Sequence, residues 1–140
     1  SPNVPNIGLI AQQAEAAGAD AITAVNTMGP GMLIDIKMRC PILANKVGGI
    51  SGQALKPIAV RCVYDIYKAV KIPIIGTGGI IKGTDAIEML MAGASLLGIG
   101  SAIVAYDLAC FDMINEKIQE FMKEEGFSDI SELVGLAHEK

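Results

Sequence analysis

Two glycine-containing segments in the second half of this chain have the residue types of an anion-binding site. Gly78-Gly79 follows one apolar run, and Gly100-Ser101 follows the next. Glycine lets backbone N–H groups approach an anion closely because no Cβ stands in the way. We therefore predict a phosphate site formed by these segments and by a short helix that begins at Ser101. The alternative is that the glycines only serve tight turns and close helix–strand packing.

Asn26 and Thr27 offer a second kind of chemistry at the end of an earlier apolar run. An amide next to a hydroxyl could recognise a planar polar ligand, or it could cap its own loop. The chain contains no Ser/His/Asp arrangement, no Walker lysine motif and no GxGxxG. Hydrolase, NTPase and dinucleotide-binding functions therefore lack support, which leaves a phosphate-bearing cofactor.

The candidate residues follow short apolar runs that the sequence predicts to be strands, alternating with apolar residues at helical spacing. The runs occupy residues 21–25, 41–45, 73–77 and 96–100, and the helical patterns lie at 7–17, 55–66, 86–91 and 111–121. This order predicts one α/β domain over residues 1–140, with four parallel strands buried on both faces. Ligands meet such sheets at the carboxyl ends of the strands. The long segment 26–40 is expected to cover that edge.

Composition narrows the class of function. Of the 140 residues, 51% are hydrophobic, the net charge is -4, and the basic residues are scattered. Neither nucleic acid nor an anionic membrane surface is therefore an expected partner. Cys40, Cys62 and Cys110 lie far apart and are odd in number, which predicts a reducing, cytoplasmic setting. His138 is expected on the surface, no metal site is expected, and glycines interrupt the uncharged stretch 89–106 too often for a membrane span.

Taken together, the motifs resemble one family of enzymes. The resemblance rests on Ala24-Val25-Asn26-Thr27, Pro41-Ile42-Leu43-Ala44-Asn45, Gly48-Gly49-Ile50-Ser51-Gly52, Lys56-Pro57, Ile74-Ile75-Gly76-Thr77-Gly78-Gly79-Ile80, and Ala92-Gly93-Ala94 before Gly100-Ser101. In this order they resemble dihydroorotate dehydrogenase, in its cytosolic FMN-containing class. The resemblance implies a (β/α)8 TIM barrel that oxidises dihydroorotate to orotate in de novo pyrimidine biosynthesis. It also implies a partner subunit that carries an iron–sulfur cluster and FAD for electron transfer.

The resemblance further implies roles for individual residues. Contacts to FMN would come from Val25, Gly52, Gly78, Gly79, Gly100 and Ser101, the last four around its phosphate. Asn26 and Thr27 would hydrogen-bond the substrate. The family's catalytic base is a cysteine on a loop that this sequence lacks, so no catalytic residue is assigned. A whole barrel takes about 250 residues, and we expect the chain to be its C-terminal half and to be inactive alone.

Two alternatives stay open at this point. The pyrimidine-reducing domain of dihydropyrimidine dehydrogenase is a related flavin barrel that shares Gly48-Gly49-Ile50-Ser51-Gly52. The second alternative is a non-catalytic half-barrel that associates with itself, because half of a closed sheet has two unpaired edges. A homo-oligomer is expected in either case.

Overall fold

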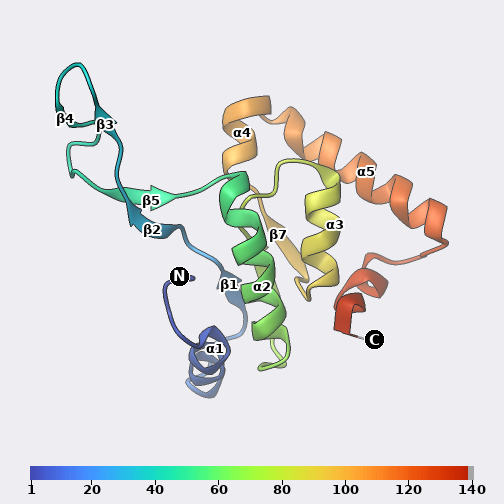
Figure 1. Ribbon diagram of the computed structural model, residues 1–140. Coiled ribbons are helices and arrows are strands. Elements are labelled where there is room, and N and C mark those ends of the chain that lie inside the picture. Colours follow the sequence, from blue (N-terminus) through green and yellow to red (C-terminus); the bar gives the residue numbers. More distant parts are fainter. Residues whose placement is uncertain (139–140) are drawn as a thin grey trace.

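A computed structural model of the protein describes residues 1–138. At its centre lies a three-stranded parallel sheet, ordered β1-β6-β7. The strands are short: β1 (Ile22–Ala24), β6 (Ile74–Thr77) and β7 (Leu96–Gly98). Helical segments join them, as parallel strands require, and Figure 1 shows α2 and α3 crossing in front of the sheet.

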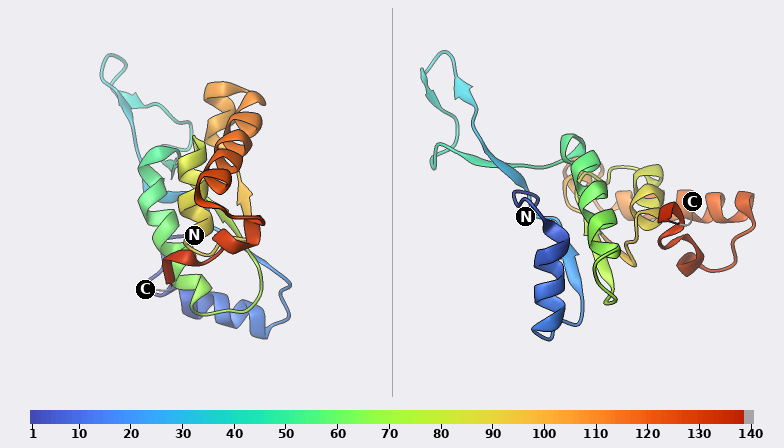
Figure 2. Two further views of the ribbon diagram at one scale, coloured as in Figure 1. Left: turned by 90° about the vertical axis from the view of Figure 1, so that its right-hand side faces the viewer. Right: turned by 60° about the horizontal axis from the view of Figure 1, so that its bottom comes forward.

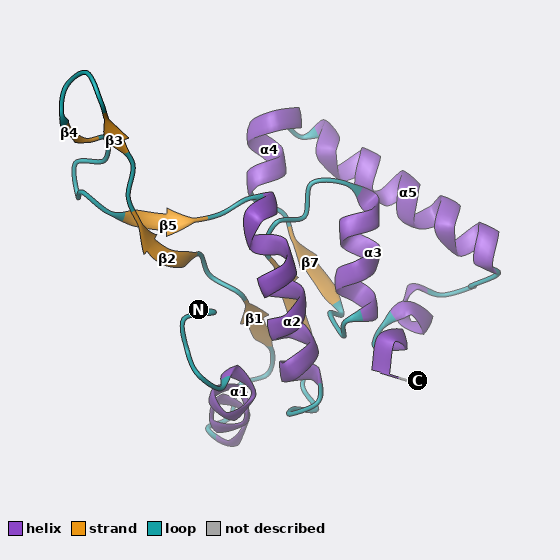
Figure 3. Cartoon of the chain, viewed as in Figure 1, coloured by secondary structure: helices purple, strands orange, loops and turns teal. Residues whose placement is uncertain are grey.

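The helices follow the apolar spacing predicted from the sequence. They are α1 (Ile7–Ala16), α2 (Lys56–Tyr67), α3 (Gly83–Met91), the short α4 (Ser101–Tyr106) and α5 (Ala109–Glu125). Single turns of 3-10 helix occupy Gln53–Leu55, Ile130–Leu133 and Leu136–His138. Gly18, at φ 96°, follows α1, as the glycine stop predicted. Figure 3 shows these helices gathered around one small sheet.

One face of the sheet packs against helices and forms the core. Ala59, Val63 and Met89, from α2 and α3, are completely buried. Gly76 in the middle strand allows a close approach, because a Cβ there would lie 2.5 Å from the Cγ of Met89 on α3. This helix therefore rests directly on the backbone of the sheet at this point.

The opposite face of the sheet is open, which corrects the prediction that the strands are buried on both faces. Thr23, Ile75 and Leu96 form one row across the three strands. Leu96 is 63% exposed and Thr23 is exposed, whereas the neighbouring row contains the buried Ala24 and Gly76. Alternation along a strand sends successive side chains to opposite faces. Only the row facing α2 and α3 therefore lies in the core.

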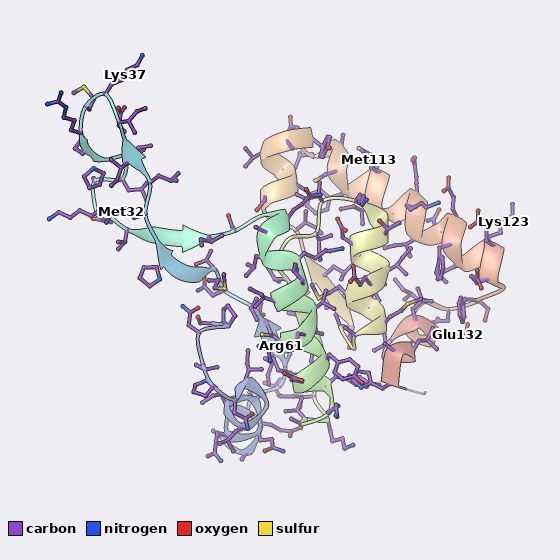
Figure 4. The ribbon with its side chains drawn as sticks, viewed as in Figure 1. Met32, Lys37, Arg61, Met113, Lys123 and Glu132 are labelled. Carbon is purple, nitrogen blue, oxygen red and sulfur yellow. The ribbon has the colours of Figure 1, made fainter. Side chains whose placement is uncertain are left out.

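Residues 28–50 form an arm that projects away from the sheet (Figures 1 and 2). Two antiparallel pairs build it: β2 (Met28–Gly31) with β5 (Gly48–Ile50), and β3 (Ile34–Asp35) with β4 (Cys40–Pro41). Its apolar side chains are largely exposed, Ile36 at 86% and Met38 at 73%. Figure 4 shows Met32 and Lys37 on the arm, well separated from Arg61 on α2.

The arm corrects two predictions. Residues 41–45 do not form a fourth parallel strand, since only Cys40–Pro41 is extended and Ile42 is 60% exposed. In segment 26–40, Asn26 and Thr27 lie at the edge of the sheet, but the chain from Met28 onward projects away and does not cover that edge. The reason lies in the connection: no helix separates β1 from this run, so the chain lacks the crossover that a parallel strand needs. It reverses in antiparallel pairs instead.

The C-terminal end of the chain packs against α2 and α3. The ring of His138 stacks on Tyr64 with centroids 3.7 Å apart, and its Nε2 lies 3.0 Å from the carbonyl oxygen of Ala92. The prediction of a plain surface histidine was therefore wrong. Among the described residues, no helix is long and apolar enough to cross a membrane.

Candidate functional site

A pocket of about 200 Å³ lies at the carboxyl ends of the three parallel strands. It gathers every site residue that the sequence singled out, although β1 and β7 are more than seventy residues apart. We call it the strand-end pocket. Its lining consists of Val25, Asn26, Thr27, Ser51, Gly52, Leu55, Thr77, Gly78, Gly79, Ile80, Gly98, Gly100 and Ser101.

The glycines of the pocket divide into two groups. Gly78 and Gly79 have φ values of +136° and +74°, and a Cβ at Gly78 would lie 2.7 Å from the Cβ of Ala59. The turn and the close packing therefore require glycine at these two positions, as the structural alternative predicted. Gly100 differs, because a Cβ there would have no neighbour within 4 Å. Gly52 also has open space, with only the hydroxyl of Ser101 at 3.9 Å, but its φ of +80° favours glycine.

The pocket offers hydrogen-bond donors without a positive charge. Within the described chain, no acceptor takes the backbone N–H groups of Gly78, Gly79 and Ile80. The first N–H groups of α4, at Ser101, also lack intrahelical partners, as at any helix start. No Lys, Arg or His among residues 1–138 lines the pocket. Such a set of neutral donors can hold an anion through oriented dipoles.

Asn26 and Thr27 lie between the strand-end pocket and a second cavity of about 290 Å³ at the base of the arm. The Oδ1 atom of Asn26 accepts a 2.7 Å hydrogen bond from the Thr27 N–H. Local capping therefore uses the carbonyl of this amide, while its Nδ2 stays available as a donor. Asn3 also lines the second cavity, where its Oδ1 accepts from the N–H of Gly29 at 3.3 Å. The sequence offered no signal for Asn3.

None of the three cysteines lines the strand-end pocket. Cys40 is exposed on the arm, and Cys62 and Cys110 are buried among apolar side chains. Burial raises the pKa of the Cys62 thiol, which makes it less reactive. Among the described residues, no group of three His, Cys, Asp or Glu side chains could hold a metal ion.

An ion pair between the half-buried Lys56 and the buried Asp85 lies next to the residues of the pocket, and sequence reasoning missed it. The Nζ of Lys56 donates to Asp85 Oδ1 at 3.0 Å and to Glu88 Oε2 at 2.6 Å. These hydrogen bonds, to Glu88 first and then to Asp85, raise the pKa of Lys56. Burial alone would raise the pKa of Asp85, but hydrogen bonds from Lys56 and from the N–H groups of Ile81 and Lys82 lower it further than burial raises it. The only sequence signal was an acidic residue in the first turn of a helix.

The largest cavity, about 500 Å³, lies elsewhere, between the start of α1 and the end of α2. Asn6, Gln12, Asp65 and Lys68 are among its lining residues. It touches none of the strand ends, where ligands bind to parallel sheets. We therefore take the smaller strand-end pocket as the candidate site.

Comparison with known proteins agrees with this choice of family. The sequence profile of the family described as dihydroorotate dehydrogenase matches residues 1–122. A Methanothermobacter thermautotrophicus protein named dihydroorotate dehydrogenase B (NAD(+)), catalytic subunit, is 52% identical over 139 residues, covering 99% of this chain and 46% of its own length. A protein of the same name from Thermococcus kodakarensis is 50% identical over 139 residues, with the same coverage.

Solved structures extend the similarity to the fold. The Eimeria tenella DHODH in complex with ferulenol superposes with a TM-score of 0.81 at 25% identity, covering 100% of this chain and 37% of that one. The ligand-free form gives a TM-score of 0.82, also at 25% identity, and covers 100% of this chain and 39% of that one. The chain spans about half the length of the curated relatives that it matches. The chain therefore has a part of this fold. The narrower expectation, that the chain is the C-terminal half of the barrel, is not borne out.

Proposed function

Because the chain belongs to the dihydroorotate dehydrogenase family, we propose that it carries part of the cofactor and substrate sites of an enzyme that oxidises dihydroorotate to orotate, a step of de novo pyrimidine biosynthesis. The observation that carries the proposal is the strand-end pocket, which brings together residues from three separate strands. Its donors suit an anionic ligand, and its place at the carboxyl ends of parallel strands is where such folds bind ligands.

The proposed cofactor is FMN, and the residues fit its phosphate end. A pocket of about 200 Å³ is smaller than the roughly 300–1,000 Å³ of whole small-molecule sites. We propose that it holds the phosphate and the adjoining chain of such a cofactor, with part of the ring system extending beyond it. When bound, FMN would accept the hydride that dihydroorotate loses.

We assign the phosphate to the donors at the ends of β6 and β7. Gly78, Gly79, Gly100 and Ser101 would surround it, with backbone N–H groups and the Ser101 hydroxyl donating. Val25, at the end of β1, and Gly52, in the turn before α2, would contact the remainder of the cofactor. The bare backbone at Gly100 leaves room for the ligand that a side chain would fill.

We assign the substrate to the side of the pocket at which Asn26 and Thr27 lie. The Nδ2 of Asn26 can donate to the carboxylate or to ring carbonyls of dihydroorotate. The Thr27 hydroxyl donates to Asn26 Oδ1 at 3.3 Å and can accept from a ring N–H of the substrate. The second cavity, which shares both residues with the strand-end pocket, provides space next to them. These two residues would thus orient the substrate beside the cofactor.

The remaining machinery is proposed to lie outside this chain. The family's base is a cysteine, and the chain's own cysteines lie away from the pocket. The 140-residue chain is therefore expected to form no orotate by itself. The relatives' names call them catalytic subunits, which supports a further subunit, proposed here to carry iron–sulfur and FAD centres. Free thiols support a cytoplasmic setting.

A self-associating half-barrel is the second candidate, favoured by one observation. The row of Thr23, Ile75 and Leu96 leaves one sheet face uncovered, although parallel sheets are normally covered on both faces. Light scattering tests this: a concentration-dependent dimer supports it, and a 14.6 kDa monomer that binds FMN contradicts it.

Fluorescence titration of FMN into the purified chain tests the proposed function. We expect saturable quenching by the wild-type chain and at least about tenfold weaker binding by Gly100→Leu, because the new side chain fills the pocket. Gly100 has a φ of −124°, which lies outside the left-handed region that favours glycine. Val104→Leu is the matched control, at a 92% exposed position of α4. Equal affinity of all three proteins would refute the assignment of the pocket.

A further inference from the structure

We propose that Lys56 and Asp85 form a positioning pair that holds the glycine turns of the strand-end pocket at the separation that phosphate binding needs. This inference deepens the proposed function and rests on it. Neither side chain lines the pocket. Their effect on a ligand would therefore be transmitted through the backbone of the two turns, one before α2 and one after β6.

Asp85 secures the turn that follows β6. Its side chain is only 3% exposed, and its Oδ2 accepts hydrogen bonds of 3.1 Å from the N–H groups of both Ile81 and Lys82. Its other oxygen accepts from Lys56 Nζ at 3.0 Å. The carboxylate thus joins the end of segment 78–82 to Lys56, the first residue of α2. Lys56 lies twenty-nine residues before Asp85 in the sequence.

Lys56 secures the same two segments through its backbone. A Cβ at Gly79 would lie 2.7 Å from the backbone nitrogen of Lys56 and 2.8 Å from the carbonyl oxygen of Gly52. Gly79 is therefore in direct contact with Gly52 and Lys56, and the ion pair forms a second link between the same two turns. A shift of α2 relative to segment 78–82 would change the spacing of the pocket's donors.

A direct role for Lys56 is the alternative, in which its ammonium would bind the phosphate. The contacts favour the indirect role, because Nζ is engaged by Asp85 and Glu88 at 3.0 and 2.6 Å. The two roles differ for Asp85→Asn. A positioning pair predicts weaker phosphate binding by this variant, whereas a direct ligand released from its partner predicts equal or tighter binding.

The test compares FMN with riboflavin, which lacks the phosphate, by fluorescence titration of the full chain. The variants are Lys56→Met, Asp85→Asn and the double variant Lys56→Met/Asp85→Asn. The double variant leaves no unpaired charge between the two residues, so it can be tested even if a single variant fails to fold. We expect each folded variant to lose about tenfold in FMN affinity with little change for riboflavin, and Lys56→Arg to restore most of it. Arg61→Met is the matched control, since Arg61 hydrogen-bonds Asp65 and Cys62 of its own helix and does not line the strand-end pocket.

Hydrogen exchange provides a readout that needs no ligand. The amides of Ile81 and Lys82 should exchange at least about tenfold faster in the double variant than in Arg61→Met. In the double variant, the carboxylate that accepts from both amides is replaced by a neutral amide group that Lys56 no longer holds in place. Unchanged exchange together with an unchanged FMN-to-riboflavin ratio would overturn the inference. Failure of the wild-type chain to bind either flavin would refute the proposed function, and exchange would still decide whether the pair holds the turns.

Discussion

Thr77 and Gly98 face each other across β6 and β7, and the Thr77 hydroxyl occupies the space that a side chain at Gly98 would need. Both residues line the strand-end pocket. Because Gly98 has no side chain, β7 leaves room for the Thr77 side chain of β6, at the edge where the candidate ligand would bind.

This contact predicts the effect of Gly98→Ala. The added methyl group meets Thr77 and forces the two strand ends apart, so we expect a loss of about 1–3 kcal/mol in the free energy of unfolding. Urea denaturation measures the loss. The double variant Gly98→Ala/Thr77→Ala should recover part of it, because the hydroxyl and methyl groups of Thr77 are gone. Additive losses in the double variant would contradict the steric explanation.

The buried carboxylate of Asp85 predicts a pH dependence of stability. Its pKa is lowered from the ordinary value of 3.8, chiefly because the hydrogen bonds from Lys56 and two backbone N–H groups outweigh burial. A folded-state pKa below the unfolded one stabilises the protein above pH 3.8, and the contribution is lost as pH falls through the folded-state value. Asp85→Asn should therefore cost about 1–3 kcal/mol near neutral pH. The difference in urea midpoint between this variant and the wild type should shrink as the pH falls below 3.8, and a constant difference would contradict this.

The C-terminal turn contributes to the core, which predicts the effect of Leu133→Ala. Leu133 is completely buried although it lies in a single turn of 3-10 helix. Its truncation should cost about 2–5 kcal/mol of stability. Leu108→Ala is the control, because Leu108 is 67% exposed and its truncation leaves no cavity. Similar thermal midpoints for the two variants would show that the turn is not part of the cooperative unit.

The arm should be the first part of the chain to be cut by trypsin. Its tip contains Lys37 and Arg39 and is held by a two-residue strand pair without a core beneath it. Sparse packing lowers the free energy of local opening. We expect mass spectrometry to identify the earliest cuts after these residues. Asp35→Ala should speed them, since Asp35 Oδ1 accepts from the N–H groups of Lys37 and Met38 at 2.8 and 2.9 Å. First cuts within α2 would contradict this order of local stability.

Local chemistry made the helices and the site predictable. Apolar residues at helical spacing located α1, α2, α3 and α5, and Gly18 located the end of the first. Because carboxyl ends of parallel strands meet at one edge, residues chosen from three strand ends were bound to come together. Asn26, Gly79 and Ser101 do so in one pocket.

Long-range relationships decided the rest. An apolar run such as 41–45 fits a buried strand or an exposed arm equally well, and the choice depended on the absence of a helix to carry the chain across. The open face at Leu96 follows from register between strands, which no single run contains. The bond from Lys56 to Asp85 joins residues that are apart in sequence, and a lysine or aspartate alone gives no sign of its partner. The sequence by itself therefore determined which segments are helical and which strand ends line the candidate pocket, because these depend on neighbouring residues. Only the tertiary structure decided which faces are covered and which charges meet, because those depend on segments distant along the chain.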